Sequence, residues 1–267
     1  MLRFSKMNGA GNDFVVIDNC DGLIKLSAQQ IRLLCDRHRG IGADGVLLVE
    51  PSSLADFRMR YFNSDGGEAE MCANGARCFA RFANRILGAG DGVQFETLAG
   101  IIRAECHNET VKLELSEPKE LVLNRTLEIE GRKLSVHSIN TGVPHVVTFV
   151  DDLDRAPVRE WGAKIRHHAA FSPNGTNTNF SKEATIGKIV IRTYERGVED
   201  ETLACGTGVA ASALVYAALN DLEIPVQVLV RGGDWLEVGF RRTGSGFEKV
   251  TLEGPADFSF EGTINIG

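Results

Sequence analysis

An internal repeat that fills the chain constrains its fold more than any other feature. The segment "MCANGARCFARFANRIL" is echoed by "LACGTGVAASALVYAAL", which places Cys72 and Cys205 133 positions apart. The segments "MNGAGNDFVVID" and "NTGVPHVVTFVD" are separated by the same 133 positions. Because the chain has 267 residues, the repeat accounts for both of its halves. The sequence therefore predicts two domains of one design.

Short apolar or alternating runs, such as "GVLLVE", "KIVIRTY" and "DWLEVGF", predict strands bounded by turns. Glycine turns at 98–100 and 232–234 predict hairpins, and hence largely antiparallel sheets. Ser27 and Gln30 form a capping box ahead of "IRLLCDRH", which predicts a helix there, and "RAPVREWGAKIRHH" predicts another.

The two segments that follow the cysteines predict helices of different character. After Cys72, apolar residues recur at helical spacing, with Arg77, Arg81, Asn84 and Arg85 on the opposite face. After Cys205 the run is apolar nearly all round, which is typical of a helix buried on every side. A sheet wrapped around a central helix would supply that burial.

We therefore predict an α+β fold of two pseudo-symmetric domains, each a mainly antiparallel sheet wrapped around a central helix. The expected domains are 1–117 and 118–255, joined near "SEPKELVLN". Their cysteine-headed helices are expected to face each other across a cleft.

Composition limits the classes of partner. The net charge of -7 argues against nucleic acid or an anionic membrane as the partner. No stretch reaches about 18 apolar residues and the N-terminus carries no export signal, so a cytoplasmic protein is expected. Six scattered cysteines without a C-x2-C spacing predict reduced thiols and no structural metal site.

The positions of the two cysteines predict acid and base chemistry. A helix N-terminus carries partial positive charge and unsatisfied N–H groups, which stabilise a thiolate and can hold a carboxylate beside it. If Cys72 and Cys205 flank one carbon atom, one thiolate could remove a proton while the opposite thiol delivers another. The result would be inversion of a stereocentre.

Other interpretations compete with this one. Either cysteine could be a small core residue, as we expect for Cys20, Cys35, Cys78 and Cys106. A cysteine hydrolase would need one nucleophile and leaves the matched pair unexplained. A carboxylate-binding module without catalysis is a further alternative. "GIGADG" matches a dinucleotide fingerprint, but it follows a predicted helix and precedes a predicted strand, which is the reverse of the required order.

Five segments resemble signatures of the diaminopimelate epimerase family: "KMNGAGNDFVVID", "FNSDGGEAEMCANGARC", "NTGVPHVV", "GTNTNF" and "YERGVEDETLACGTG". The resemblance implies conversion of LL-diaminopimelate to the meso isomer, in lysine and peptidoglycan synthesis, with no cofactor and no metal. It also implies a homodimer, and a C-terminal strand, 256–267, that returns to the first domain. A racemase of another amino acid on the same fold is the main alternative, since the thiol pair suits it equally well.

The resemblance also assigns roles to individual residues. It places the acid/base pair on Cys72 and Cys205, with His145 and Glu195 beside the thiols. The implied substrate-binding positions are Glu195 and the following residues: Asn12, Asn63, Ala73, Asn74, Asn177, Arg196, Gly206 and Thr207. Arg196 suits the distal carboxylate of a substrate that has an amino acid group at each end, because a guanidinium binds a carboxylate through two hydrogen bonds. Without the resemblance, asparagines in loops more often make turns than bind ligands.

Overall fold

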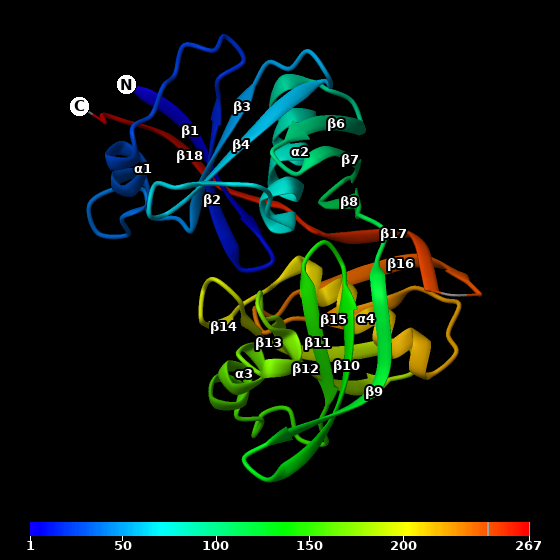
Figure 1. The fold of residues 1–267 in the computed structure, drawn as a ribbon. Helices are drawn as coiled ribbons and strands as arrows, with labels where there is room; N and C mark the ends of the chain where they lie inside the picture. Colours follow the sequence, from blue (N-terminus) through cyan, green and yellow to red (C-terminus); the bar gives the residue numbers. More distant parts are fainter. Residues whose placement is uncertain (245, 267) are drawn as a thin grey trace. The chain divides into compact units, whose positions relative to one another are not determined.

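The structure is a computed structural model that describes residues 1–244 and 246–266. The chain forms two compact units (Figure 1). Unit 1 comprises residues 1–113 and the C-terminal segment from Gly254 onward, and unit 2 comprises Glu114–Glu253. None of the helices in the described ranges combines the length and the apolar character that crossing a membrane requires.

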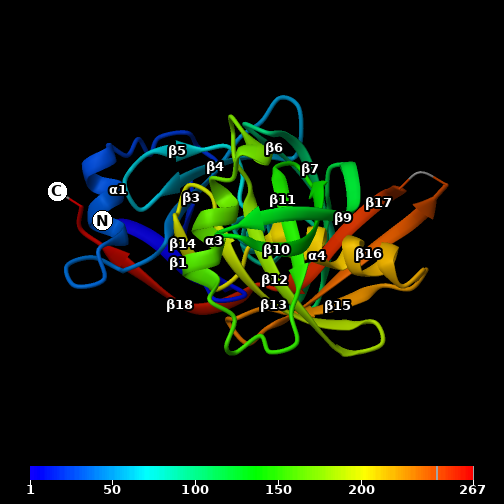
Figure 2. The same ribbon diagram turned by 60° about the horizontal axis from the view of Figure 1, so that its bottom comes forward.

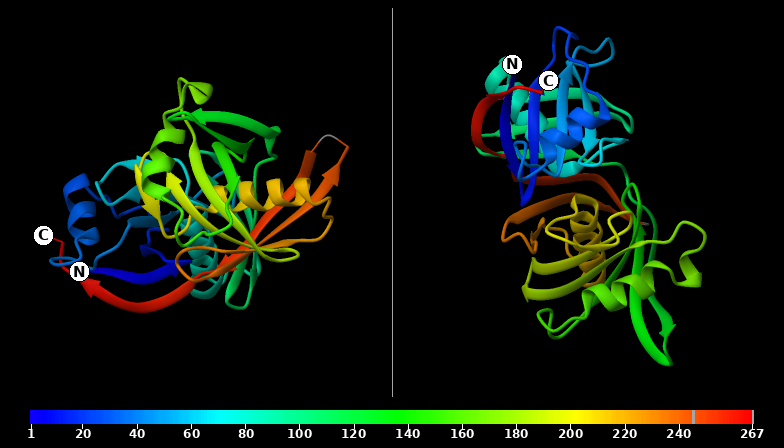
Figure 3. Two further views of the ribbon diagram at one scale, coloured as in Figure 1. Left: turned by 90° about the horizontal axis from the view of Figure 1, so that it is seen from below. Right: turned by 90° about the vertical axis from the view of Figure 1, so that its left-hand side faces the viewer.

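Unit 1 contains a sheet with two helices. Its elements are β1 (Leu2–Gly9), β2 (Asn12–Asp18), α1 (Ala28–Cys35), β3 (Gly45–Glu50), β4 (Phe57–Asn63), β5 (Glu68–Ala69), α2 (Ala73–Leu87), β6 (Gly92–Thr97), β7 (Gly100–His107), β8 (Thr110–Glu114) and β18 (Asp257–Ile264). The last strand, β18, pairs antiparallel with β1, so the two ends of the chain lie side by side (Figures 1 and 3).

Unit 2 contains the corresponding set of elements. These are β9 (Lys119–Ile129), β10 (Arg132–Asn140), β11 (Pro144–Phe149), α3 (Val158–Arg166), the 3-10 helix η1 (Ala169–Phe171), β12 (Asn177–Thr185), β13 (Lys188–Glu195), β14 (Asp200–Thr202), α4 (Gly206–Leu219), β15 (Val226–Leu229), β16 (Trp235–Thr243) and β17 (Gly246–Pro255). Helix α3 packs on the outside of β12 and β13 (Figure 2).

The two units repeat one pattern of strand pairing. In unit 1, β1–β2 is antiparallel, β2–β3 parallel, β3–β4 antiparallel, β4–β6 parallel, and β6–β7 and β7–β8 antiparallel. In unit 2, β10–β11, β11–β12, β12–β13, β13–β15, β15–β16 and β16–β17 follow the same order of directions. This repetition, with the helices in matching places, confirms the predicted fold class.

Helices α2 and α4 occupy the centres of their units. Helix α2 packs against β1, β2, β3, β4, β6 and β7, and α4 packs against β9 to β13, β15 and β16 (Figure 3). Gly9 lets β1 approach the first turn of α2, because a side chain there would meet the Asn74 carbonyl oxygen at 2.7 Å. The prediction of a helix buried on all sides is confirmed for α4, where Val209 to Val215 are all fully buried.

Two arginines on the polar face of α2, Arg77 and Arg81, are also buried, which the amphipathic pattern of the helix alone does not indicate, whereas Arg85 on the same face is exposed. Arg77 is fully buried and donates to the Pro255 carbonyl at 3.2 Å and to Asn74 Oδ1 at 3.1 Å. Arg81 donates to the Ala256 carbonyl at 2.5 Å. Buried guanidinium groups need such acceptors, so these arginines tie the C-terminal segment to the central helix of unit 1.

Several predictions from the sequence can be compared directly with the structure. The capping box of Ser27 and Gln30 is present at the start of α1, and the predicted turns at 98–100 and 232–234 join β6 to β7 and β15 to β16. The segment in which we expected the domain junction, 116–124, runs largely within β9. The prediction that Cys20 is a core residue is wrong, because it lies exposed in the turn after β2, whereas Cys35, Cys78 and Cys106 are buried.

Candidate functional site

The first half of the candidate site is the N-terminus of α2 in unit 1. Cys72 is the N-cap residue, in extended conformation, and its carbonyl accepts the first helical hydrogen bond from the Ala76 N–H at 2.8 Å. The N–H groups of Ala73, Asn74 and Gly75 therefore precede that bond and point out of the positive end of the helix. A thiolate or a carboxylate is stabilised at this position.

Asn12 contacts the Cys72 sulfur with its side chain. Its Oδ1 lies 3.6 Å from Cys72 Sγ, and its Nδ2 donates to Asp44 Oδ2 at 2.6 Å. A carboxylate can only accept, so the amide group must turn its NH2 toward Asp44. The oxygen is thereby presented to Cys72, and the thiol is the natural donor to it.

A network of ion pairs holds Asp44 in place. Arg37 Nη2 lies 2.9 Å from Asp44 Oδ1 and 2.8 Å from Asp13 Oδ1, and Lys6 Nζ lies 2.7 Å from Asp13 Oδ2. The Asp44 N–H also donates to Asp13 Oδ1 at 2.9 Å. Burial raises the pKa of Asp13, but the bonds from Arg37 and Lys6 outweigh burial and lower it to about 2.

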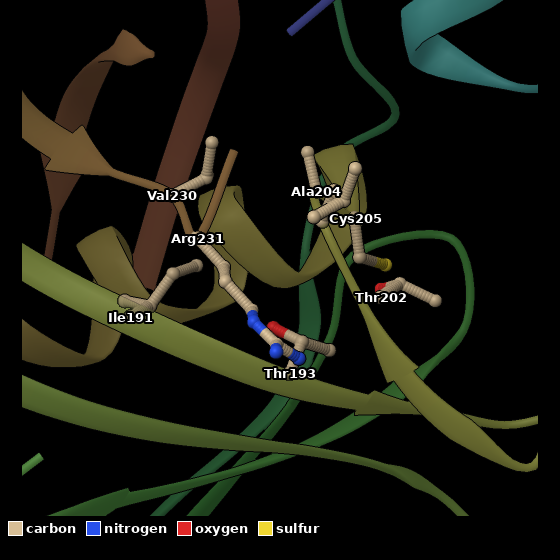
Figure 4. A pocket seen from close by; sticks show the side chains of 8 residues that line it. Ile191, Thr193, Thr202, Ala204, Cys205, Val230 and Arg231 are labelled. Carbon is tan, nitrogen blue, oxygen red and sulfur yellow. The ribbon is translucent and has the colours of Figure 1, made fainter. Parts of the chain in front are cut away.

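The second half of the candidate site is the N-terminus of α4 in unit 2. Cys205 is again an extended N-cap residue, and its carbonyl accepts from the Val209 N–H at 2.9 Å. Its sulfur lies 3.5 Å from Thr207 Oγ1. Cys205 also lines a small pocket (Figure 4) with Ile191, Thr193, Thr202, Leu203, Ala204, Val230 and Arg231. In Figure 4 the Thr202 hydroxyl and the Cys205 sulfur are turned toward one another.

His145 reaches Cys205 through Thr207. His145 Nε2 lies 2.9 Å from Thr207 Oγ1, and His145 Nδ1 lies 3.2 Å from Asn179 Nδ2. Asn179 Nδ2 also donates to the Val146 carbonyl at 2.9 Å, which fixes the orientation of the amide. Nδ1 of His145 is therefore an acceptor, and the neutral ring carries its proton on Nε2. Burial, assisted by the charge of Arg196, lowers the pKa of His145 to about 3.

Gly208 makes room for this arrangement at the first turn of α4. A side chain on Gly208 would fall on Asn179 Oδ1, so only glycine lets the amide lie against the helix. The Thr193 hydroxyl donates to the same oxygen at 2.9 Å. Both the nitrogen and the oxygen of the Asn179 amide are thus hydrogen-bonded, and the fixed amide in turn orients the ring of His145.

Glu195 is the last residue of β13, and Arg196 begins the loop that follows. Burial raises the pKa of Glu195, and the neighbouring Thr202 hydroxyl partly opposes the rise. Asn177 Oδ1 accepts from the Arg196 N–H at 2.8 Å, and Asn177 Nδ2 donates to the Pro144 carbonyl at 3.1 Å. Asn177 therefore holds the segments before His145 and after Glu195 together.

The remaining predicted residues of unit 1 are held by local contacts. Asn63, at the end of β4, accepts a hydrogen bond from the Tyr61 hydroxyl at 2.6 Å and lies opposite Gly45 of β3 in the sheet. Asn74 Oδ1 accepts from Arg77, so the N–H of Asn74 is the group it offers at the helix end. The structure thus gathers Asn12, Cys72, Ala73 and Asn74 in unit 1, and gathers Cys205, Gly206, Thr207, His145, Glu195, Asn177 and Arg196 in unit 2.

The separation of 133 positions that relates the cysteines also relates their surroundings. It carries Asn12 onto His145, Asp44 onto Asn177, Asn63 onto Arg196, and Asn74 onto Thr207. Parallel pairing places His145 opposite Asn177 in unit 2, and the contact of Asn12 with Asp44 is its counterpart in unit 1. The scaffold is repeated, whereas the side chains that face the two sulfurs differ.

Sequence reasoning missed several of these residues. Asp44 lies in "GIGADG", which we had considered only as a nucleotide fingerprint, and Asn179 lies in "GTNTNF". The matched positions of the repeat could have identified Asp44, because it corresponds to the predicted residue Asn177. Among the described residues, no group of three or more His, Cys, Asp or Glu side chains is arranged to hold a metal ion.

Comparison with known proteins gives one family. The diaminopimelate epimerase family model matches residues 4–120 and 137–254. A diaminopimelate epimerase of Chlorobaculum tepidum is 42% identical over 97% of this chain and 100% of its own length. One from Archaeoglobus fulgidus is 45% identical over 87% of each chain.

Solved structures of other isomerases share the fold at low identity. A hydroxyproline epimerase from Agrobacterium vitis has a TM-score of 0.69 at 16% identity, covering 98% of this chain and 91% of its own. A probable proline racemase from Agrobacterium radiobacter has a TM-score of 0.71 at 15% identity, covering 100% and 94%.

Proposed function

Because this chain belongs to the diaminopimelate epimerase family, we propose that it converts LL-2,6-diaminopimelate to meso-diaminopimelate, without a cofactor, in lysine and peptidoglycan biosynthesis. It is an isomerase. Its reaction inverts one α-carbon, so a proton must leave one face of that carbon and another must arrive on the opposite face.

Cys72 and Cys205 are the proposed acid/base pair. One thiolate takes the α-proton and forms an S–H bond, while the other thiol gives its proton to the opposite face of the carbon. The N–H groups of Ala73, Asn74, Gly206 and Thr207 are the proposed cradle for the α-carboxylate, whose developing negative charge they would stabilise. Asn12, Asn63, Asn177, Glu195 and Arg196 are the proposed contacts to the rest of the substrate.

One observation carries this proposal. Each cysteine is the N-cap of the central helix of its unit, at matching positions of the repeat, and each sulfur has a polar side chain beside it. Neither a core role nor a single nucleophile would need both helix ends to be built alike.

A racemase acting on another amino acid is the second candidate. The relatives named diaminopimelate epimerase are 38% to 45% identical to this chain, whereas the hydroxyproline epimerase is only 16% identical and supports the fold alone. The substrate with two amino acid ends is therefore favoured.

Proton NMR of the reduced protein with LL-diaminopimelate in deuterium oxide tests both candidates. We expect deuterium at the α-position as the meso isomer appears, and no exchange in Cys72→Ala or Cys205→Ala. Cys106→Ala, which changes a buried thiol outside the candidate site, is the matched control and should retain exchange. Exchange with proline or another amino acid, but not with this compound, would favour the racemase. Binding without any exchange would indicate a carboxylate-binding module.

We also propose a cytoplasmic homodimer, from the membership of the diaminopimelate epimerase family. Light scattering of the purified protein should give twice the 29.0 kDa of one chain. A mass of one chain across micromolar concentrations would overturn the dimer.

A further inference from the structure

The loop between β13 and β14, residues 196–199, is bound to α3 through two arginines. Arg166, the last residue of α3, donates from Nε to Glu199 Oε1 at 3.2 Å. Arg159, in the first turn of the same helix, donates from Nε to Asp200 Oδ1 at 2.6 Å. The two arginines are two helical turns apart, so they lie on one face of α3. That face therefore holds the end of the loop.

Arg166 and Arg196 share one hydrogen-bond acceptor. The Nη1 atoms of both guanidinium groups lie 3.3 Å from the Asn174 carbonyl oxygen. The Arg166 side chain is only 15% exposed, and Gly175 leaves room for it, because a side chain at Gly175 would fall on Arg166 Nη1. On the other side, Asn177 Oδ1 accepts from the Arg196 N–H at 2.8 Å. The backbone and the guanidinium of Arg196 are thus both held by the segment 174–177.

The carboxylate of Glu199 links this segment to the rest of the loop. Its Oε1 accepts from the Gly197 N–H at 3.0 Å as well as from Arg166, and its Oε2 accepts from the Tyr194 hydroxyl at 3.3 Å. Glu199 therefore joins the end of α3, the end of β13 and the backbone next to Arg196.

The matching position in unit 1 is a glycine. Glu199 has a φ of 57°, in the left-handed region, and the separation of 133 positions relates it to Gly66, which has a φ of 90°. Glycine adopts this conformation without strain, whereas a residue with a side chain is disfavoured there. Unit 2 therefore has a glutamate where the backbone favours glycine. Backbone strain of this kind indicates a use for the side chain.

We infer that Arg166 and Glu199 are positioning residues for Arg196, and that through Arg196 they set the affinity for a substrate with a second carboxylate. This inference rests on the proposed function, in which Arg196 binds the distal end of the substrate. A guanidinium binds a carboxylate through two parallel hydrogen bonds only in a narrow range of orientations. Arg166 and Glu199 preserve that orientation, and neither is assigned a contact with the substrate.

Steady-state kinetics with LL-diaminopimelate test the inference. Glu199→Gln and Arg166→Gln should each raise KM about tenfold, the equivalent of one hydrogen bond to a charged group, with kcat unchanged. The split is expected because the distal carboxylate keeps its charge throughout the reaction. Glu160→Gln, which breaks an ion pair with Lys164 on the same helix, is the matched control and should change neither constant. An unchanged KM in either loop variant, or a loss confined to kcat, would overturn the inference.

Glu199→Gly separates positioning from folding. Glycine suits the left-handed backbone but lacks the carboxylate, and an ion pair near the surface contributes little to stability. We therefore expect the midpoint of urea denaturation to be unchanged or higher, while KM still rises about tenfold. An unchanged KM, or a lower midpoint that accompanies the rise, would overturn the positioning role.

Arg196→Ala shows whether Glu199 acts through Arg196. If it does, Glu199→Gln added to Arg196→Ala should raise KM no further than Arg196→Ala alone. A further rise of the size seen in the single variant would mean that Glu199 acts by another route, and would overturn the inference.

The inference and the proposed function fail in distinguishable ways. An unmodified protein that does not epimerise LL-diaminopimelate contradicts the proposed function, and with it the inference that rests on it. An active protein whose KM does not respond to substitution of Arg166 or Glu199 contradicts the inference alone.

Discussion

Asn179 Nδ2 lies 3.2 Å from Nδ1 of His145, and the buried amide can offer only hydrogens on that side because it also donates to the Val146 carbonyl. The contact therefore fixes the tautomer of His145. It makes His145 Nε2 a donor to the Thr207 hydroxyl, which in turn contacts the Cys205 sulfur. The following predictions test this arrangement and its counterpart in unit 1.

His145 is expected to stay neutral throughout the neutral pH range. Because burial lowers its pKa to about 3, nitrogen NMR of 15N-histidine-labelled protein should show one ring with a protonated Nε2, a bare Nδ1, and no titration between pH 5 and 8. The folded-state pKa lies below the ordinary value of 6.5, so the unfolded chain binds the proton first and His145 reduces stability as the pH falls from 6.5 toward 3. A ring assigned to His145 that titrates near pH 6.5 would contradict this buried, neutral histidine.

Asn179→Asp should reverse the direction of the hydrogen bonds that run from Asn179 through His145 to Thr207. A carboxylate cannot donate to His145 Nδ1, so the proton moves to Nδ1 and Nε2 becomes an acceptor for the Thr207 hydroxyl. The Thr207 hydroxyl can then no longer donate to Cys205, and kcat should fall about tenfold, the equivalent of one hydrogen bond to a charged group. Asn84→Asp, in an exposed contact with the Gly90 carbonyl, is the control for the same chemical change. Full activity of Asn179→Asp would show that the tautomer is irrelevant to catalysis.

Gly75 and Gly208 occupy the same position in α2 and α4, three residues after each cysteine, yet their substitution by alanine should have opposite results. At Gly75 the new side chain would make ordinary contacts of 3.4 Å with Leu47 and Phe14, and the gain in helix propensity should stabilise the protein by up to about 1 kcal/mol. At Gly208 it would displace Asn179, at a cost of about 1–3 kcal/mol. Urea denaturation of the two variants measures the difference, and equal effects would contradict the close approach of Asn179 to α4.

Acid stability should depend on Asp13. Its pKa is lowered from 3.8 to about 2 in the folded state, so its ion pairs stabilise the protein above pH 3.8 and the contribution is lost as the pH falls through that interval. The free energy of unfolding of the unmodified protein should fall by about 2 kcal/mol more between pH 4 and 2 than that of Asp13→Asn. Asp152→Asn removes an exposed carboxylate that pairs with Arg155, and should leave the pH dependence unchanged. Parallel curves for Asp13→Asn and the unmodified protein would exclude this role.

The sequence predicts the parts of this molecule that depend on local pattern or on the repeat. The buried character of α4, the capping box of α1 and the N-cap position of each cysteine follow from residues close together in the chain. The repeat then predicts that whatever surrounds Cys72 has a counterpart around Cys205.

Other features depend on contacts between distant segments, and no local pattern contains them. The acceptors of Arg77 and Arg81 lie at Pro255 and Ala256, so the burial of these arginines could not be predicted from the helix alone. The contact of Asn12 with Asp44 likewise joins the start of β2 to the residue before β3, and nothing in either segment indicates which way the amide turns. For Cys20 the prediction fails in the other direction. Its residue type predicts burial, but it lies in an exposed turn.

Cys205 is only 8% exposed, and under the proposed two-thiol mechanism this burial has a kinetic consequence when its sulfur receives a hydrogen from the substrate. Each conversion would then leave that hydrogen where water reaches it poorly, and a second molecule of the same isomer could not react until the hydrogen had left. The protein would retain a hydrogen isotope taken from its last substrate. At high concentrations of one isomer, the exchange of this hydrogen with water, and not the proton transfer at carbon, would be the rate-limiting step of turnover.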